Sequence, residues 1–303
     1  MIQASACGKV ILCGEHAVVY GVPALALPLL QLRAIAEIRE DGRPCSLLAP
    51  DLNLDLVVSP EVSHPLVTTV LSALGHFDSP MPAAQIKVSS QIPIGRGLGS
   101  GTAISAAIFR ALANYFGRSV ERAEEQAFIH QIETLYHGRP SGIDGAVIGY
   151  ERALRFVRGK RPEFLDLPTG WSLLIADSGE TTPTHVMVNG LRTRRDADPQ
   201  LYDPLIATIG DLSRQAEVCL KCNAMVLLGQ FLNRNHDLLC QLGLSTPRLD
   251  ELVDIARAAG ALGAKLSGGG GGGVLIALTR DRAREIEAAW RAAGVRNCWR
   301  LDY

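Results

Sequence analysis

Aromatic residues are scarce in this sequence of 303 residues. Phe, Trp and Tyr together make up 5% of it, whereas hydrophobic residues make up 47%. Aliphatic side chains must therefore fill most of any core. The chain is long for a single core, and its length predicts two domains that each bury an interior of their own.

The sequence also lacks an excess of charge of either sign. It has 30 Lys and Arg against 31 Asp and Glu, a formal net charge of −1. Proteins that bind nucleic acid or acidic membranes need a basic surface, so we expect neither partner. A small anionic ligand would have to be held by local groups.

No long uninterrupted hydrophobic run is present. The most apolar early segment, residues 10–32, contains Glu15, His16, Pro23 and Pro28, which excludes a membrane-spanning helix there. No signal peptide is recognisable. We therefore expect a cytoplasmic protein that does not bind to a membrane.

The seven cysteines give little support to a disulfide framework or a zinc site. Their number is odd, which fits a reducing compartment. Cys219 and Cys222 form one C-x-x-C in a predicted helix, but no second pair or histidine cluster completes a metal site. We interpret the cysteines as buried or incidental thiols.

The most informative stretch is a glycine-rich loop, residues 92–102 (IPIGRGLGSGT), that runs directly into an apolar pattern of helical period. The pattern predicts a buried helix over residues 103–116, stopped by Gly117. Glycines before a helix let backbone N–H groups converge on a phosphate. The loop lacks the Gly-Lys-Ser/Thr ending of a Walker loop and the downstream acidic residue of a dinucleotide fold. In isolation, a tight structural turn is an equally good interpretation.

Other elements are predicted from alternating apolar residues, from apolar residues at helical spacing and from the turn-forming and helix-breaking residues between them. A domain boundary is expected near residues 168–170, residues 41–64 are expected to be rich in loops, and Ser119 is expected to cap a helix. The expected strands are residues 4–13, 33–39, 85–92, 153–157, 172–177 and 274–278, and the expected helices are residues 65–74, 119–136, 199–219, 223–241 and 247–260.

Two segments carry candidate chemistry outside the loop. One predicted strand and the turn after it carry Lys9, Glu15 and His16. The alternative interpretation is a solvated edge-strand lysine beside an ordinary turn. Glu133 lies at a predicted helix end, and Asp144 follows on a loop constrained by proline and glycine. Such carboxylates can divide the work of holding a cation and addressing a hydroxyl; a surface glutamate and a turn aspartate are the alternative.

Two further loops remain open to interpretation. The hydroxyls of residues 178–184 precede a helix and would either cap it or touch a substrate. Six consecutive glycines, residues 268–273, precede a predicted strand. Such a run is either a flexible linker or a place where backbone approaches a ligand or a neighbouring domain closely.

Taken together, four segments resemble the GHMP small-molecule kinases. Residues 8–21 (GKVILCGEHAVVYG) are similar to the amino-terminal motif of the members that phosphorylate mevalonate, and residues 92–102 resemble the family's P-x-G-x-G-L-G-S-S-A phosphate loop. Glu133 with residues 140–144 (PSGID) matches the metal-ligand and catalytic segment, and residues 265–273 resemble the carboxy-terminal glycine motif. The segments follow the family's order along the chain, which makes the set more specific than any one loop.

The resemblance implies an α/β (α+β) fold of two domains. Residues 1–168 would form an N-terminal GHMP kinase domain of the ribosomal protein S5 domain 2-like type, and residues 169–303 a ferredoxin-like C-terminal domain. It also implies ATP-dependent phosphorylation of mevalonate to 5-phosphomevalonate in isoprenoid biosynthesis, with Mg²⁺ as cofactor and the sites between the domains. The alternatives are a related kinase acting on phosphomevalonate, homoserine, a sugar or the 3-hydroxyl of mevalonate, or a non-catalytic sensor. The oligomeric state stays open, a homodimer included.

The resemblance also assigns roles to single residues. Asp144 would be the catalytic base, and the charge of Lys9 would favour the alkoxide that forms on the acceptor. Mevalonate would be bordered by Glu15, His16 and Thr184, and Mg²⁺ would be held by Glu133 and Ser100. The phosphates of ATP would be wrapped by Gly95, Arg96, Gly97, Leu98, Gly99, Ser100, Gly101 and Thr102.

One departure from the family pattern concerns the metal. Gly101 stands where the family usually has a second serine that reaches Mg²⁺. Ser100, Thr102 or a water would have to complete the metal shell, because Mg²⁺ commonly keeps several waters. Arg96 occupies a position that is usually small; it would either add charge near the phosphates or be a solvated loop arginine.

Overall fold

The structure is a computed structural model that describes residues 1–137 and 140–303. Contacts divide the chain into two compact units. Unit 1 comprises Met1–Lys9, Pro28–Ile94 and Gly99–Glu151, and unit 2 comprises Val10–Leu27, Gly95–Leu98 and Arg152–Tyr303. Strands β1 (Ile2–Cys13) and β2 (Ala24–Glu40) therefore contribute residues to both units. The boundary expected near residue 168 stays a prediction.

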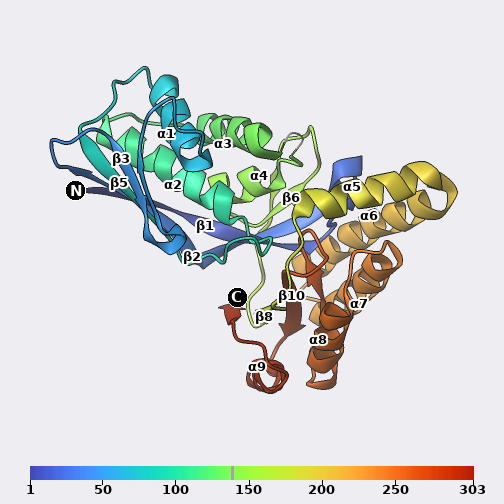
Figure 1. The fold of residues 1–303 in the computed structure, drawn as a ribbon. Helices are drawn as coiled ribbons and strands as arrows, with labels where there is room; N and C mark the ends of the chain where they lie inside the picture. Colours follow the sequence, from blue (N-terminus) through green and yellow to red (C-terminus); the bar gives the residue numbers. More distant parts are fainter. Residues whose placement is uncertain (138–139) are drawn as a thin grey trace. The chain divides into compact units, whose positions relative to one another are not determined.

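Unit 1 combines strands in the order β4-β3-β5-β2, with β1 paired to β2, and four α-helices. The β3–β5 pair is parallel, whereas β3–β4 and β2–β5 are antiparallel. The helices lie over one face of these strands (Figure 1). The bounds are β1 Ile2–Cys13, β2 Ala24–Glu40, β3 Ser46–Ala49, β4 Leu54–Val57, β5 Ala84–Ser90, α1 Pro65–His76, α2 Ser100–Tyr115, α3 Arg122–His137 and α4 Ile143–Tyr150, with a short 3-10 helix at Pro50–Leu52.

The helix predicted after the glycine-rich loop is confirmed as α2, and it starts three residues earlier than expected. Gly99 is its N-cap at φ 76°, a left-handed conformation that glycine adopts without strain. Most residues of α2 are buried, and they include small residues such as Ala103, Ala106 and Ala107. Small side chains let α2 lie close to its neighbours, so the first turn of α2 has a fixed place in unit 1.

Unit 2 contains a four-stranded antiparallel sheet in the order β11-β8-β10-β9. Numbered within the sheet this order is 4-1-3-2. Helices separate the first strand from the second and the third from the fourth, while the second and third follow directly, as in a ferredoxin-like fold, which confirms the predicted fold class. Strands β6 and β7 continue from the start of β2. The bounds are β6 Leu154–Phe156, β7 Glu163–Phe164, β8 Ser172–Asp177, β9 Gly263–Ser267, β10 Val274–Thr279, β11 Cys298–Asp302, α5 Thr184–Ala197, α6 Pro199–Lys221, α7 Met225–Gln241, α8 Pro247–Ala258 and α9 Ala283–Ala292, with a 3-10 helix at Ala17–Tyr20.

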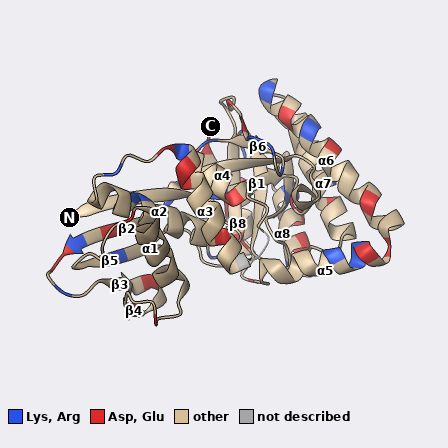
Figure 2. Cartoon of the chain, turned by 90° about the horizontal axis from the view of Figure 1, so that it is seen from above, with Lys and Arg blue, Asp and Glu red and all other residues tan. Residues whose placement is uncertain are grey.

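Surface charge and thiols match what the composition indicates. Acidic and basic residues are interspersed along α6 (Figure 2), where Lys221 donates to Glu217 at 2.6 Å. All seven cysteines are free thiols, with Cys219 buried in α6 and Cys222 exposed just after it. Among the described residues, no helix combines the length and the apolar character needed to cross a membrane.

Two expectations about local structure were wrong, and one was right but incomplete. Residues 41–64 are rich in loops, as expected, but they also contain the short strands β3 and β4. Each of these strands has only four residues, which is too short for an alternating pattern to stand out. Ser119 does not cap a helix, since α3 begins at Arg122. The strand expected to run to residue 92 ends at Ser90, where the Ser90 hydroxyl donates to the Ile92 carbonyl.

Two glycines allow α7 to touch β9. A Cβ atom on Gly229 would lie 2.3 Å from the Leu262 carbonyl oxygen, and one on Gly263 would lie 2.1 Å from the Gly229 carbonyl oxygen. No real side chain tolerates such distances. Asn233, one turn on in α7, accepts from the Ala264 N–H at 2.9 Å. The helix therefore lies directly on the backbone of the strand that carries Lys265.

This contact predicts that Gly229→Ala destabilises the chain. The methyl group has no space against the Leu262 backbone, so we expect a loss of about 1–3 kcal/mol in the free energy of unfolding. Gly75→Ala is the matched control, since Gly75 lies in α1 with no atom within 4 Å of an added Cβ. That change should stabilise slightly, by about 0.5–1 kcal/mol. Denaturant titrations would contradict the packing argument if both variants were as stable as the wild type.

A buried histidine joins α7, α8 and β9. His236 Nδ1 accepts from the Leu266 N–H at 3.3 Å, and its Nε2 lies 3.2 Å from Asp250 Oδ1 and 3.6 Å from Cys240 Sγ. The three side chains are close enough to suggest a metal site. However, a neutral imidazole whose Nδ1 accepts must carry its proton on Nε2, which then has no lone pair for a metal. The cluster is therefore a hydrogen-bond network that is buried at His236 and half-exposed at Asp250.

The same burial predicts a pH-dependent stability. Burial, followed by the charge of Arg257, lowers the pKa of His236 from 6.5 to about 4. As the pH falls, the unfolded chain takes up this proton first. Neutral His236 therefore makes its full contribution to the free energy of unfolding above about pH 6.5. This contribution, up to about 3 kcal/mol, is lost as the pH falls from about 6.5 to about 4.

Urea unfolding at several pH values would measure this loss. His236→Gln should be less stable at neutral pH but should lose less stability on acidification than the wild type. His130→Gln, on an exposed residue of α3, should keep the wild-type pH dependence. An unchanged pH dependence in His236→Gln would contradict the prediction.

Candidate active site

An ion pair between Lys9 and Asp144 lies in unit 1. Lys9 Nζ is 3.0 Å from Asp144 Oδ1, and the side chain of Lys9 is 5% exposed whereas that of Asp144 is 29% exposed. Asp144 was expected on a loop, but it lies in the first turn of α4. Gly142, at φ 88°, is the N-cap that turns the chain into this helix, and a carboxylate in a first turn is favoured by the helix dipole. The structure thus brings together the two predicted catalytic residues.

Gly99 lets α2 start beside the stem of Lys9. A Cβ atom at this position would lie 2.8 Å from Ile148 Cδ1 and 3.1 Å from Lys9 Cγ. Any larger residue would push the lysine or α4 aside, in addition to being strained at φ 76°. The last part of the glycine-rich loop therefore fits closely against Lys9, the lysine to which the family resemblance assigns a catalytic role.

Glu133, in α3, is the third charged group of this part of unit 1. Its Oε1 accepts from Thr102 Oγ1 at 2.8 Å, and its buried Oε2 has no hydrogen-bond partner among the described residues. Burial, followed by the negative charge of Asp144, raises the pKa of Glu133, while the Thr102 hydroxyl and the charge of Lys9 oppose this. A carboxylate in these surroundings needs a proton or a cation.

These groups fit a divalent cation with hard character. Mg²⁺ prefers oxygen ligands and is often bound by one or two carboxylates together with phosphate oxygens. Glu133 offers a bare, buried carboxylate oxygen, and the nearby charge of Asp144 adds to the negative potential that would attract a cation there. Ser100 is the first residue of α2, and Gly101 is exposed with open space around an added Cβ. Of the two candidate hydroxyls, that of Thr102 is the one that contacts Glu133.

The first half of the glycine-rich loop packs on the glycine run within unit 2. A Cβ on Gly268 would lie 3.5 Å from Gly97 Cα, and one on Gly273 would lie 3.1 Å from the Arg96 carbonyl oxygen. Within the run itself, a Cβ on Gly270 would lie 2.3 Å from the Leu244 carbonyl oxygen. The run is therefore tightly packed backbone, and its interpretation as a flexible linker was wrong.

Arg96 anchors this loop. Its Nε lies 3.1 Å from Asp177 Oδ2, and its guanidinium donates to the Glu180 carbonyl at 2.6 Å. The neighbouring carbonyl of Gly95 accepts from the Thr181 hydroxyl at 3.0 Å. Arg96 is thus not a freely solvated arginine. It also lines a pocket of ≈ 360 Å³ together with Asp177, Ser178, Gly179, Gly294, Arg296 and Asn297.

Of the three residues predicted to border the acceptor, two contact Gly269 in the glycine run and the third pairs with Lys265 in β9. His16 Nε2 lies 2.9 Å from the Gly269 carbonyl oxygen. A Cβ on Gly269 would lie 2.9 Å from Thr184 Oγ1, and Thr184 opens α5. Glu15 is fully buried and pairs with Lys265, which is fully buried as well. The structure therefore groups Glu15, His16 and Thr184 within unit 2.

His16 is held as a neutral acceptor. Its Nε2 must donate to the Gly269 carbonyl, which leaves a lone pair on Nδ1, and this buried atom has no partner among the described residues. Burial is the main cause that lowers the pKa of His16 to about 4. The backbone φ of 59° is unusual for a non-glycine residue and marks a conformation held by its surroundings. His16 can thus accept a hydrogen bond from a hydroxyl.

Lys265 is a site residue to which the sequence reasoning gave no role. It donates to the Leu266 carbonyl at 2.6 Å besides pairing with Glu15. Its position between Ala264 and Leu266 in an apolar strand is the signal that could have found it, since a buried lysine requires a partner. The partner lies 250 residues earlier.

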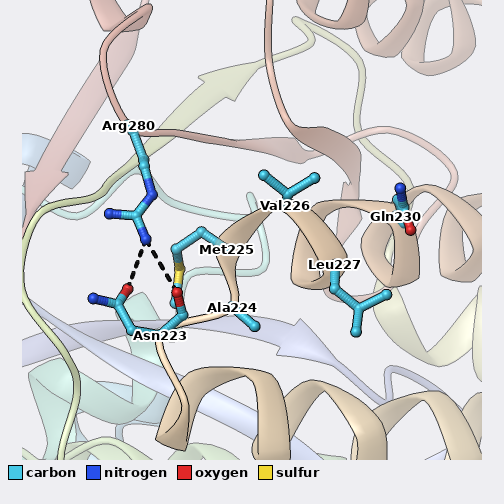
Figure 3. A pocket seen from close by; sticks show the side chains of 7 residues that line it. All are labelled: Asn223, Ala224, Met225, Val226, Leu227, Gln230 and Arg280. Atoms are coloured by element: carbon cyan, nitrogen blue, oxygen red, sulfur yellow. Dashed lines mark hydrogen bonds between the residues drawn. The ribbon is translucent and has the colours of Figure 1, made fainter.

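A second pocket in unit 2 involves none of these residues. It measures ≈ 330 Å³ and lies at the start of α7, where Arg280 donates to the Asn223 backbone carbonyl and side-chain oxygens at 3.0 Å (Figure 3). Val226 and Leu227 line it with largely exposed side chains. It holds no predicted catalytic or binding residue.

Two family models match the chain. The one described as GHMP kinases N terminal domain matches residues 65–152, and the one described as GHMP kinases C terminal matches residues 216–296. The first match contains Glu133 and Asp144, and the second contains Lys265 and the glycine run.

Similar proteins and structures agree with these matches. The mevalonate kinase of Pyrococcus horikoshii is 35% identical, with 97% of this chain and 93% of that protein covered. That of Methanothermobacter thermautotrophicus is 32% identical, with 96% and 95% covered. The crystal structure of the Methanococcus jannaschii mevalonate kinase matches with a TM-score of 0.87 at 26% identity, covering 98% of this chain and 96% of that one. The structure of L. major mevalonate kinase in complex with R-mevalonate matches with a TM-score of 0.83 at 25% identity, covering 98% and 94%. The chain therefore belongs to the GHMP kinase family.

Proposed function

We propose that this chain transfers the γ-phosphoryl group of ATP to the primary C5 hydroxyl of mevalonate, giving ADP and 5-phosphomevalonate. The observation that carries the proposal is the Lys9–Asp144 ion pair at 3.0 Å beside the start of α2. Relatives that match nearly the whole chain are mevalonate kinases, and one matching structure holds R-mevalonate. Together they favour mevalonate over the other acceptors considered.

Asp144 and Lys9 divide the work on the acceptor hydroxyl. Asp144 Oδ accepts the proton as the hydroxyl oxygen attacks the γ-phosphorus and the bond to the β-phosphate oxygen breaks. The ammonium of Lys9 stabilises the negative charge that develops on the attacking oxygen. Because Lys9 is almost fully buried, water screens its charge little. The ion pair also holds the Asp144 carboxylate in place before the acceptor binds.

The phosphates of ATP are assigned to residues 95–102. Backbone N–H groups at the start of α2 and in the preceding turns favour an anion. Contacts to Gly268, Gly273 and Asp177 fix the first half of this loop, and the fit of Gly99 against Lys9 fixes the second. The loop is therefore preorganised at both ends.

Mg²⁺ is assigned to Glu133 through its bare carboxylate oxygen. Bound there together with ATP, it would neutralise charge on the phosphate oxygens. Thr102 donates to the other oxygen of Glu133 and so favours the ionised form of the carboxylate. Ser100 keeps its predicted place as a further ligand.

The acceptor is assigned to Glu15, His16 and Thr184. His16 Nδ1 is a neutral acceptor for a hydroxyl, and the hydroxyl of Thr184 can donate to a carboxylate or accept from a hydroxyl. The buried Lys265 holds Glu15 in place. These roles follow the family resemblance and the grouping of the three residues in unit 2.

The proposal predicts ADP formation that depends on mevalonate. The purified chain, incubated with ATP, Mg²⁺ and one alcohol at a time, should give ADP and 5-phosphomevalonate with mevalonate. Phosphomevalonate, homoserine and galactose should give at most about a hundredth of that rate. Turnover with another alcohol but not with mevalonate would overturn the substrate assignment. ATP binding without turnover of any alcohol would favour the sensor alternative.

Asp144→Asn tests the mechanism. The amide cannot take the proton, so we expect kcat to fall about 10²–10⁴-fold, with the KM for ATP within about threefold of the wild-type value. The matched control is Asp166→Asn, because the side chain of Asp166 is fully exposed, and it should leave kcat unchanged. A near-normal kcat in Asp144→Asn would remove this carboxylate from the catalytic role.

A further inference from the structure

In the first turn of α2 the buried hydroxyl belongs to Thr102, whereas the family pattern has a serine at position 101. Gly101 is exposed, and a Cβ added to it would meet no atom within 4 Å. The next residue, Thr102, occupies the position of an alanine in the family's loop pattern, and it is only 9% exposed. Successive residues of a helix point about 100° apart, so a hydroxyl at residue 102 cannot simply replace one at residue 101. The side chain of Thr102 points toward α3.

The partner of Thr102 is one oxygen of Glu133. Thr102 Oγ1 lies 2.8 Å from Glu133 Oε1, and Glu133 is 6% exposed. A Cβ added to Gly145 would lie 3.6 Å from Glu133 Oε2, so this second oxygen faces the first turn of α4. Asp144 precedes Gly145 in that turn. The hydroxyl of Thr102 thus engages one oxygen of Glu133 while the other faces the turn that carries Asp144.

We propose that Thr102 is a positioning residue for the metal site: by donating to Oε1, it fixes the Glu133 carboxylate so that Oε2 is the oxygen presented to the cation. This inference rests on the proposed function, because the cation is the one that accompanies ATP. A terminal carboxylate torsion is soft, and within residues 1–137 and 140–303 Glu133 accepts a hydrogen bond from Thr102 alone. Groups that orient a metal ligand in this way typically change metal affinity about 10–100-fold when removed.

Mn²⁺ is a suitable probe, since it accepts the same oxygen ligands as Mg²⁺ and its free concentration is measured directly by electron paramagnetic resonance. The titration uses the full chain with a non-hydrolysable ATP analogue, so it needs no turnover. Thr102→Val has nearly the shape of threonine but no hydroxyl, and it should raise the dissociation constant of Mn²⁺ about tenfold or more. Thr102→Ser restores the hydroxyl and should return the constant to within about threefold of the wild-type value.

The matched control is Thr134→Val in α3. Thr134 neighbours Glu133 in sequence, but its hydroxyl donates to the His130 carbonyl of its own helix at 2.8 Å. This change should leave Mn²⁺ affinity unchanged. In the kinetic assay, Thr102→Val should raise the half-saturating Mg²⁺ concentration by a similar factor, with kcat at saturating Mg²⁺ reduced much less. If Thr102 served packing alone, its replacement by valine would not raise the half-saturating Mg²⁺ concentration more than it lowers kcat, and serine would not restore the affinity.

Wild-type affinity for Mn²⁺ in Thr102→Val, or an affinity in Thr102→Ser as weak as in Thr102→Val, would overturn the proposal. Should Thr102→Val not fold by circular dichroism, Thr102→Ala takes its place with the same expected result. The Mn²⁺ titration also separates this inference from the proposed function. A chain that fails to phosphorylate mevalonate refutes the function, whereas the effect of Thr102 on the bound cation is measured without any acceptor.

Discussion

The constraint on which unit 1 depends is the burial of charge. Lys9 and Glu133 are almost completely removed from water, and Asp144 is partly removed. Such groups are unstable unless each has a partner. Lys9 is matched by Asp144, whereas among the described residues Glu133 has only a neutral hydroxyl for one oxygen. The Glu133 carboxylate therefore needs a proton or a cation, and this need is what supports the proposal of a cation that accompanies ATP.

A second constraint is the close approach of backbone to backbone in unit 2. Gly97 meets Gly268, Gly270 meets the Leu244 carbonyl and Gly229 meets β9. At Gly270 and Gly229 a single methyl group would force the chain to move, whereas at Gly97 and Gly268 it would have space but would be strained by the positive φ of both residues. Loops held in this way lose little further entropy when a ligand binds. The glycines thus make the loops rigid, although glycine-rich segments are usually regarded as flexible.

The sequence predicted the types of elements better than the surroundings of the candidate site residues. The α2 helix and the strands β8 and β10 were visible because their apolar patterns are long and regular. Short β3 and β4 were missed, and the helix that carries Asp144 was missed because a glycine cap at φ 88° reads as a loop. The contact between Thr102 and Glu133 depends on how α2 packs on α3, and the pairing of Glu15 with Lys265 spans most of the chain. Neither contact has a local signal, since each arises only when distant segments fold together.

The way the chain is divided has a consequence for attempts to split the gene. Unit 2 includes Val10–Leu27 and Gly95–Leu98 in addition to everything from Arg152 onward. A fragment that starts after residue 168 would contain Lys265 without Glu15, leaving a fully buried ammonium without its counter-ion, at a cost of about 3–5 kcal/mol. It would also lack β6 and the stretch of β2 that pairs with it. Half-length fragments are therefore poor candidates for separate expression, whereas a circular permutant retains every one of these segments in a single polypeptide.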